Sequence, residues 1–128
     1  MSEAKIPIQL KLFGVGTLEG VVFRHISPIC ADALLAKIPF VLRGRFKFGS
    51  KDSWILPGVD IRKGTNQKAQ KDAQKRDILY NPKSDELIII LASKMMPNKM
   101  NKIGEITSNL DVLKEARNGL SMKFTKKG

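Results

Sequence analysis

Apolar and polar residues alternate over the first part of the chain, which is the pattern of half-buried β-strands. Segment 6–12 (IPIQLKL) places isoleucine or leucine at every second position, and segment 18–24 (LEGVVFR) follows after Gly14 and Gly16. Glycine supplies the positive φ angles that hairpin loops require. The pattern therefore predicts that the chain opens with a β-hairpin.

A short helix is predicted next. Ser27 followed by Pro28 is typical of a helix start, with serine as the cap and proline at the first helical position. The residues that follow, ICADALLAK, are amphipathic, and Pro39 ends the helix. The face predicted to be buried consists of Ile29, Ala33 and Leu34.

The middle of the chain combines alternation with basic residues. In segment 41–48 a face of leucine, glycine and phenylalanine alternates with a face that carries two arginines and a lysine. The first face is predicted to join the core, and the second can meet a phosphate backbone or water. Segments 53–56 and 59–61 are predicted as two short strands, or as one strand bent at Pro57 and Gly58. Segment 62–76 has almost no apolar residues and is predicted to be an exposed basic loop.

The last third of the chain predicts further strands and a second helix. Segment 87–92 is apolar throughout, as in a strand buried on both sides, and the methionine-rich segment 95–100 is predicted to be a flexible apolar loop. Ser108 and Asp111 resemble a capping box, and segment 120–124 alternates as a closing strand. The second helix is predicted to bury Leu110, Leu113 and Ala116. About eight short strands and two short helices favour a closed, mainly β barrel.

Length and composition indicate one domain, residues 1–128. The chain is 42% hydrophobic but has no apolar run of about 18 residues, so no segment is expected to span a membrane. The first residues lack the zones of a signal peptide, and a cytoplasmic location is predicted. One cysteine, Cys30, and one histidine, His25, give no disulfide framework and no clustered metal ligands, so no cofactor is expected.

Positive charge is the strongest compositional signal. The 23 Lys and Arg residues against 12 Asp and Glu give a net charge of +11. Segment 37–76 holds eleven basic and three acidic residues, so it carries +8 of that total. Such a field attracts phosphates, anionic surfaces or acidic proteins, although a solvated surface that maintains solubility is the simpler interpretation. The candidates for binding a nucleic acid or another anion are Arg43, Arg45, Lys47, Arg62, Lys63, Lys68, Lys71, Lys75 and Arg76.

Six segments follow one another in a characteristic order: AKIPF, WILPGVDI, DILYNP, DELIIILA, NKIGEI and NLDVLKEARNGLSMKF. Their order resembles that of the small prokaryotic cyclophilin-like proteins, a compact version of the cyclophilin barrel. The resemblance covers most of residues 6–124 and implies a closed barrel that binds a peptide or a small ligand. Trp54 and Tyr80, the only Trp and Tyr, are the candidates for its ligand pocket, with barrel packing as the alternative.

No catalytic residue is predicted. A cyclophilin isomerises X-Pro bonds with an arginine held against the prolyl amide, but the FRH sequence at 23–25 lies in the opening hairpin, and the PGVD sequence at 57–60 lacks the family's glutamine. Cys30 is expected to be a buried thiol, and His25, which lies in segment 23–25, has no partner placed by a motif. Asp85 and Glu86 are adjacent, hence on opposite faces of a strand, which is poor geometry for an acid and base pair.

Two functions from different classes follow from these observations. The first is non-catalytic binding of a peptide or small ligand by a cyclophilin-like domain. The second is electrostatic binding of nucleic acid by the basic strand face and loop, for which affinity should fall steeply with salt. Peptidyl-prolyl isomerisation is the least favoured of the activities considered.

Overall fold

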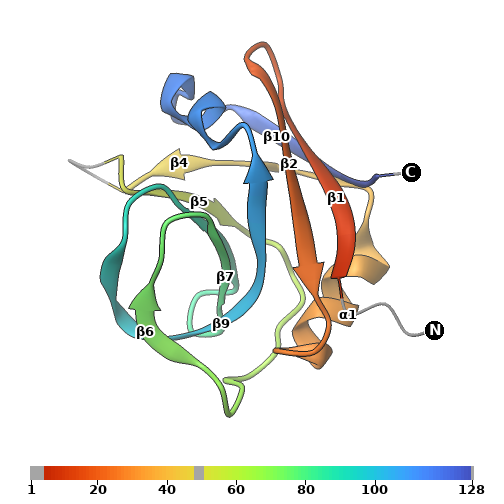
Figure 1. Ribbon diagram of the computed structural model, residues 1–128, viewed down its shortest axis with the longest axis vertical. Coiled ribbons are helices and arrows are strands. Elements are labelled where there is room, and N and C mark those ends of the chain that lie inside the picture. Colours follow the sequence, from red (N-terminus) through yellow and green to blue (C-terminus); the bar gives the residue numbers. More distant parts are fainter. Residues whose placement is uncertain (1–4, 48–50, 128) are drawn as a thin grey trace.

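Antiparallel strands dominate the computed structural model, which describes residues 5–47 and 51–127 (Figure 1). The elements are β1 (Lys5–Leu12), β2 (Gly16–Phe23), α1 (Pro28–Lys37), β3 (Phe40–Arg43), β4 (Arg45–Phe46), β5 (Ser53–Pro57), β6 (Gln70–Ala73), β7 (Asp77–Asn81), β8 (Glu86–Ile90), β9 (Lys94–Ser108), the 3-10 helix η1 (Leu110–Glu115) and β10 (Ser121–Lys126). The prediction of a mainly β protein is confirmed. In the described part of the chain, no helix is long and apolar enough to cross a membrane.

The strands form one antiparallel sheet in the order β3-β10-β1-β2-β9-β7-β8-β5-β4, and β6 pairs with β9 beside this path. The opening hairpin is confirmed, since Lys5 of β1 lies opposite Phe23 of β2 and Leu12 lies opposite Gly16. The prediction of a closed barrel of about eight strands is wrong. Within residues 5–47 and 51–127 the sheet has ten strands and is not closed, because its two end strands, β3 and β4, each pair with only one neighbour.

A bend at Gly44 divides the single strand predicted over residues 41–48 into β3 and β4. The N–H of Gly44 donates to the carbonyl oxygen of Leu120 at 3.0 Å, and the carbonyl of Gly44 accepts the N–H of Gly119 at 2.7 Å. A Cβ atom on Gly44 would lie 2.2 Å from the ring of Trp54. The chain therefore passes directly over this buried indole, and only glycine allows so close an approach.

Two clusters of buried side chains hold the sheet together. The larger one contains Trp54, Tyr80 and Phe124, all fully buried. The smaller one lies among β6, β7, β8 and β9 and consists of Ala73, Leu79, Ile88, Ile90, Met96 and Met100. The flexible loop predicted for segment 95–100 is wrong, because these residues belong to the 15-residue strand β9. Figure 1 shows β9 curving from its contact with β6 round to β2.

Segment 62–76 is only partly the exposed loop that its composition predicts. Its residues 70–73 form β6, and the side chains of Ala69 and Ala73 are buried. Because β6 buries little more than one alanine, its sequence, QKDA, carries no strand pattern. The strand predicted for segment 59–61 is absent, although Val59 is buried in the main core.

The helix start at Pro28 is confirmed, but the predicted buried face is wrong in one position. Ile29 is 69% exposed, whereas Cys30, Ala31 and Leu34 are buried. The apolar residues of this helix outnumber the positions that face the sheet, so packing decides which of them are buried. The sequence pattern could not choose between adjacent apolar residues.

The second helix is the short 3-10 helix η1 and has no capping box. Asn109 precedes it in the left-handed region with φ of 66°, and its side chain makes no cap hydrogen bond. The stripe predicted to be buried is confirmed for Leu110, Leu113 and Ala116.

Candidate functional site

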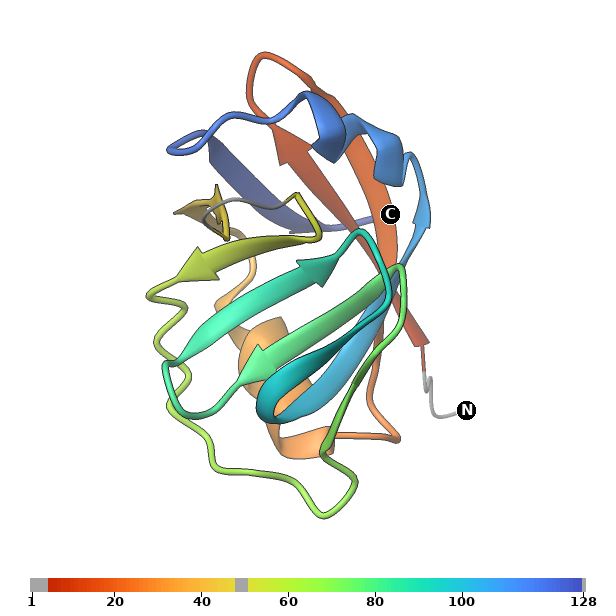
Figure 2. The same cartoon turned by 90° about the vertical axis from the view of Figure 1, so that its left-hand side faces the viewer.

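An open cavity of about 610 Å³, called here the α1 cavity, lies between the start of α1 and segment 63–68. Figure 2 shows this segment running below α1 at the lower end of the molecule. One wall is apolar and consists of Ile26, Pro28 and Ile29, and Lys63 and Lys68 line the other side. The cavity therefore combines an apolar surface with two cations.

The lysine-bearing wall is held in place by Asn101 of β9, which is fully buried. Its side-chain N–H groups donate to the carbonyl of Gly64 at 2.9 Å and to the Cys30 thiol at 3.1 Å. Its side-chain oxygen accepts the backbone N–H of Asn66 at 2.8 Å. One buried amide thus joins the loop, the helix and the sheet, and all three of its hydrogen bonds define the position of the cavity wall.

Cys30 lines the cavity, but its environment favours the thiol over the thiolate. Burial raises the pKa of Cys30, and this effect outweighs the opposing effects of the hydrogen bond from Asn101 and the charge of Lys63. A nucleophilic cysteine needs a lowered pKa. The prediction of an inert, buried thiol agrees with this environment.

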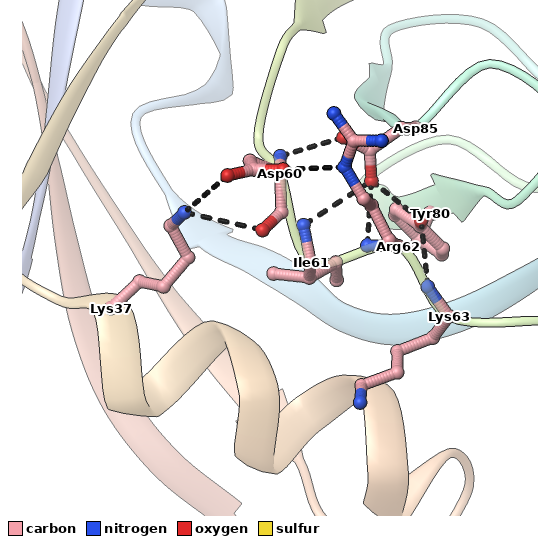
Figure 3. Close-up of polar contacts among 7 residues, drawn as sticks. All are labelled: Lys37, Asp60, Ile61, Arg62, Lys63, Tyr80 and Asp85. Atoms are coloured by element: carbon pink, nitrogen blue, oxygen red, sulfur yellow. Dashed lines mark hydrogen bonds and ion pairs between the residues drawn. The ribbon is translucent and has the colours of Figure 1, made fainter.

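A second set of hydrogen bonds fixes the residues that lead into the loop (Figure 3). The carboxylate of Asp85 accepts the backbone N–H groups of Asp60 at 2.7 Å, Ile61 at 3.2 Å and Arg62 at 2.9 Å. The hydroxyl of Tyr80 accepts the next N–H, that of Lys63, at 3.2 Å. Four consecutive backbone amides are therefore bound by two side chains from the β7–β8 hairpin. We call these six residues the Asp85 cluster.

The Asp85 cluster holds an unusual backbone conformation. Asp60, Arg62 and Asp85 have φ angles of 61°, 49° and 55°, in the left-handed region that non-glycine residues rarely adopt. Such conformations persist only where surrounding contacts impose them. Arg62 adds an ion pair to Asp60 at 2.7 Å, and Lys37 of α1 donates to the carbonyl of Asp60 at 3.3 Å.

Tyr80 and Asp85 affect each other's ionisation. The Tyr80 hydroxyl donates to Asp85 at 2.7 Å. Burial, together with this hydrogen bond, raises the pKa of Tyr80 to about 12. Partial burial pushes the pKa of Asp85 upward, but the hydrogen bonds from Tyr80 and the three amides outweigh it and hold that pKa below its usual value. At neutral pH the pair is a neutral phenol that donates to a carboxylate.

Two further hollows adjoin the α1 cavity. One, of about 630 Å³, is lined by residues that include Arg62 and Lys83, and the other, of about 460 Å³, by residues that include Lys83 and Lys99. Gly64 lines all three spaces. Because Asp85 is already bonded to four donors, the ionic character of this region comes chiefly from its cations.

The nine basic residues predicted to bind anions do not gather in one place. Lys63 and Lys68 line the α1 cavity, whereas Lys75 and Arg76 line a separate hollow of about 310 Å³. Arg62 pairs with Asp60 within the Asp85 cluster.

The basic side chains of segment 41–48 are exposed, but they do not form the single strand face that was predicted. Arg43, Arg45 and Lys47 are exposed, as is Lys71 of β6, and Phe46 is buried on the other side. Arg45 forms an ion pair with Glu86 at 3.5 Å. Phe48 lies outside the described residues. Arg43 lies in β3, Arg45 in β4 and Lys47 after the end of β4.

Trp54 and Tyr80 lie in the core, each with no exposed surface. The ring of Trp54 packs edge-on against Phe46 with centroids 4.9 Å apart. Tyr80 contributes to the Asp85 cluster only through its hydroxyl. The residues that sequence reasoning missed are Asn101, Asp85, Lys83 and Lys99. Only the tertiary fold could reveal the first two, since Asn101 bonds residues 35 and 37 positions away.

Within residues 5–47 and 51–127, no group of three or more His, Cys, Asp or Glu side chains could hold a metal ion. No protein-family model and no curated protein matches the chain. Solved structures that share its fold include the following two. The hypothetical protein AF2241 from Archaeoglobus fulgidus has a TM-score of 0.79 and 13% sequence identity, over 98% of each chain. McbB in complex with tryptophan has a TM-score of 0.77 and 11% identity, over 94% of this chain and 45% of McbB. At these identities the likeness shows the fold alone.

Proposed function

We propose that this protein binds a small ligand or a short peptide in the α1 cavity. The observation that carries the proposal is the cavity itself, about 610 Å³ in volume, with an apolar wall opposite Lys63 and Lys68. Binding sites for small molecules are typically apolar concave spaces with a few placed polar groups. An organic molecule with one apolar group and one negative charge is the simplest compound that matches both sides.

Binding without catalysis is the form of the proposal that the site supports best. The pKa of Cys30 is raised, so the cysteine remains a thiol at neutral pH. Tyr80 and Asp85 are engaged with each other and with backbone amides, which leaves neither free to accept a substrate proton. The resemblance to the small prokaryotic cyclophilin-like proteins stays part of the proposal as an expectation, and isomerisation of X-Pro bonds remains its least favoured version.

Two probes test the proposal by NMR titration of the ¹⁵N-labelled protein. Indole-3-acetate has an apolar ring and a carboxylate, and tryptophan is the compound present in the McbB complex. We expect a Kd of about 1 mM, as for a small fragment, with shifts concentrated at residues 25–30 and 63–68. Neutral indole-3-acetamide should bind more weakly than indole-3-acetate because it cannot pair with the lysines.

A bulky side chain at Gly64 provides the decisive variant. A Cβ atom on Gly64 would meet nothing within 4 Å, and Gly64 lines the α1 cavity, so the indole of Gly64→Trp is expected to occupy space in the cavity region. The matched control is Val41→Trp, at a residue of β3 that is 48% exposed. Loss of indole-3-acetate binding in the first variant only is the expected result. Equal binding by both variants and the parent protein would contradict the proposal.

Electrostatic binding of nucleic acid is the second candidate, and the net charge of +11 favours it. The basic side chains lie in several separate places, so the expected binding is weak and not sequence-specific. Affinity for a single-stranded oligonucleotide should fall steeply between about 50 and 200 mM salt. Replacement of Lys68 and Lys71 by glutamine should flatten this dependence, and an unchanged dependence would remove the hypothesis.

A further inference from the structure

We propose that the α1 cavity is the anchor pocket of a longer groove, and that this groove binds an acidic peptide segment carrying one apolar side chain. The proposal rests on the function proposed above and specifies the class of its ligand. We call the α1 cavity and the two hollows beside it the basic groove.

The three spaces are neighbours along one surface. The α1 cavity and the larger hollow share Lys63 and Gly64, and the two hollows share Gly64, Pro82 and Lys83. The groove therefore runs from the start of α1, past the loop at Gly64, to the β7–β8 turn and to Lys99 of β9. An extended peptide can follow such a path, whereas a single small molecule fills only one part of it.

Positive charge follows the whole length of the groove. Lys63, Lys68, Lys83 and Lys99 line it, and none of the four forms an ion pair with a carboxylate among the described residues. Among the described lining residues the one carboxylate is that of Asp85, which accepts hydrogen bonds from three amides and Tyr80. The four ammonium groups are thus available to the carboxylates of a ligand.

The direction of the groove is also set by charge. Beyond Lys68, the next hollow is lined by Asp72 and Asp77 as well as Lys102. Lys102 already pairs with Asp77 at 3.1 Å and with Glu105 at 2.8 Å. Among its described lining residues, that hollow offers an acidic ligand no unpaired cation beyond Lys68, so the ligand is expected to extend instead from the α1 cavity toward Lys83 and Lys99.

The lining favours a peptide over a nucleic acid. Non-specific single-strand binders stack bases on aromatic side chains. Among the described residues that line the basic groove, His25 is the only one with an aromatic ring. By contrast, the single apolar wall of Ile26, Pro28 and Ile29 suits one aliphatic side chain, and the lysines beyond it suit flanking carboxylates.

A labelled peptide, acetyl-Glu-Glu-Leu-Glu-Glu-amide, is the probe for a fluorescence-anisotropy titration at low salt. Replacing its leucine by serine should weaken binding about tenfold, because the apolar anchor is lost. A peptide with lysine in place of glutamate should not bind. A ten-nucleotide oligo-dT serves as the competing class of ligand.

Two double variants with the same change in charge locate the site. Lys83→Gln with Lys99→Gln removes two cations from the groove, and Lys123→Gln with Lys126→Gln removes two exposed cations from β10. The first should weaken binding of the leucine peptide about three- to tenfold, and the second should have a much smaller effect.

The outcomes separate this inference from the function proposed above. If the groove variant and the β10 variant weaken peptide binding equally, or if oligo-dT binds more tightly than the peptide and responds to the groove variant, the acidic-peptide inference is wrong. Indole-3-acetate binding that is lost only in Gly64→Trp would still support the cavity as a small-ligand site. If indole-3-acetate also fails to bind, the proposed function fails with it.

Discussion

Tyr80 is the only tyrosine in the chain, so its ionisation can be followed without interference from any other phenol. Raising the pH should remove its proton at about 12 in the folded protein, because burial and the hydrogen bond to Asp85 both favour the neutral phenol. In the unfolded chain the same group should titrate near its ordinary value of about 10. The predicted difference is therefore roughly two pH units, which corresponds to roughly 2.7 kcal/mol.

This difference has a defined sign for stability. Below pH 10 both states carry the Tyr80 proton, and the contribution to the free energy of unfolding is fully present. Between about pH 10 and 12 the unfolded state has lost the proton and the folded state has kept it, so the free energy of unfolding falls as the pH rises. The Tyr80→Phe variant should lack this part of the alkaline loss of stability.

The assay is the absorbance of tyrosinate near 295 nm, recorded by rapid pH jump so that the folded state is measured before it unfolds. Far-ultraviolet circular dichroism at each pH reports whether the fold is intact, and the same titration in guanidinium gives the unfolded reference. Tyr80→Phe should abolish the absorbance change and so confirm its assignment. A midpoint near 10 in the folded protein would refute the buried, Asp85-bonded placement of the hydroxyl.

Two further predictions concern stability. Gly44→Ala should lower the free energy of unfolding by about 3 kcal/mol, near the upper end for overpacked sites, because the new methyl group would overlap the fully buried ring of Trp54. Gly64→Ala, at an open position, is the control. Equal denaturant midpoints for the two variants would contradict the close packing of Gly44 against Trp54. Asp85→Asn should cost about 1.5–3 kcal/mol at pH 7, through weaker hydrogen bonds from the backbone amides. Since the folded-state pKa of Asp85 is lowered, its contribution is present above about pH 4 and is lost as the pH falls through the folded value, so the difference from the parent protein should shrink in acid. Urea unfolding at several pH values checks this, with Asp111→Asn, the same substitution at an exposed residue, as the control variant.

Elements with one buried face were the ones that could be predicted from the sequence. Strands β1, β2 and β10 alternate because every second side chain enters the core, and α1 begins where Ser27 and Pro28 indicate it. Strand β6 was not predicted because it lies beside the main path of the sheet and buries only Ala73, so its sequence does not alternate. Strand β9 was missed in part because its first half is rich in methionine, asparagine and lysine, which resembles a loop.

The closed barrel was a wrong extension of a correct observation. The many short strands are present, but a count of strands does not show whether the two end strands pair with each other. The bend that separates these end strands at Gly44 depends on Trp54 and on carbonyl and amide groups near residues 119 and 120, which the alternation of segment 41–48 does not reveal. For the site, composition correctly identified Lys63 and Lys68 as exposed cations. It could not identify Asp85, which was predicted to lie on a strand beside Glu86, whereas the structure places it in a turn with a φ of 55°.

The position of the proposed binding surface depends on side chains from distant parts of the chain. Asp85 and Tyr80 hold residues 60–63 from the β7–β8 hairpin, and Asn101 holds the next part of the loop from β9. Binding of a ligand depends on these three side chains even if none of them contacts it, because together they determine the positions of the lysines in the groove. Polar residues fixed in this way reduce the ordering that a loop must undergo when it binds. A loop so rich in lysine would otherwise be mobile, and its charges would be spread over many positions. The hydrogen bonds are therefore the physical reason to treat this part of a broadly basic surface as a site.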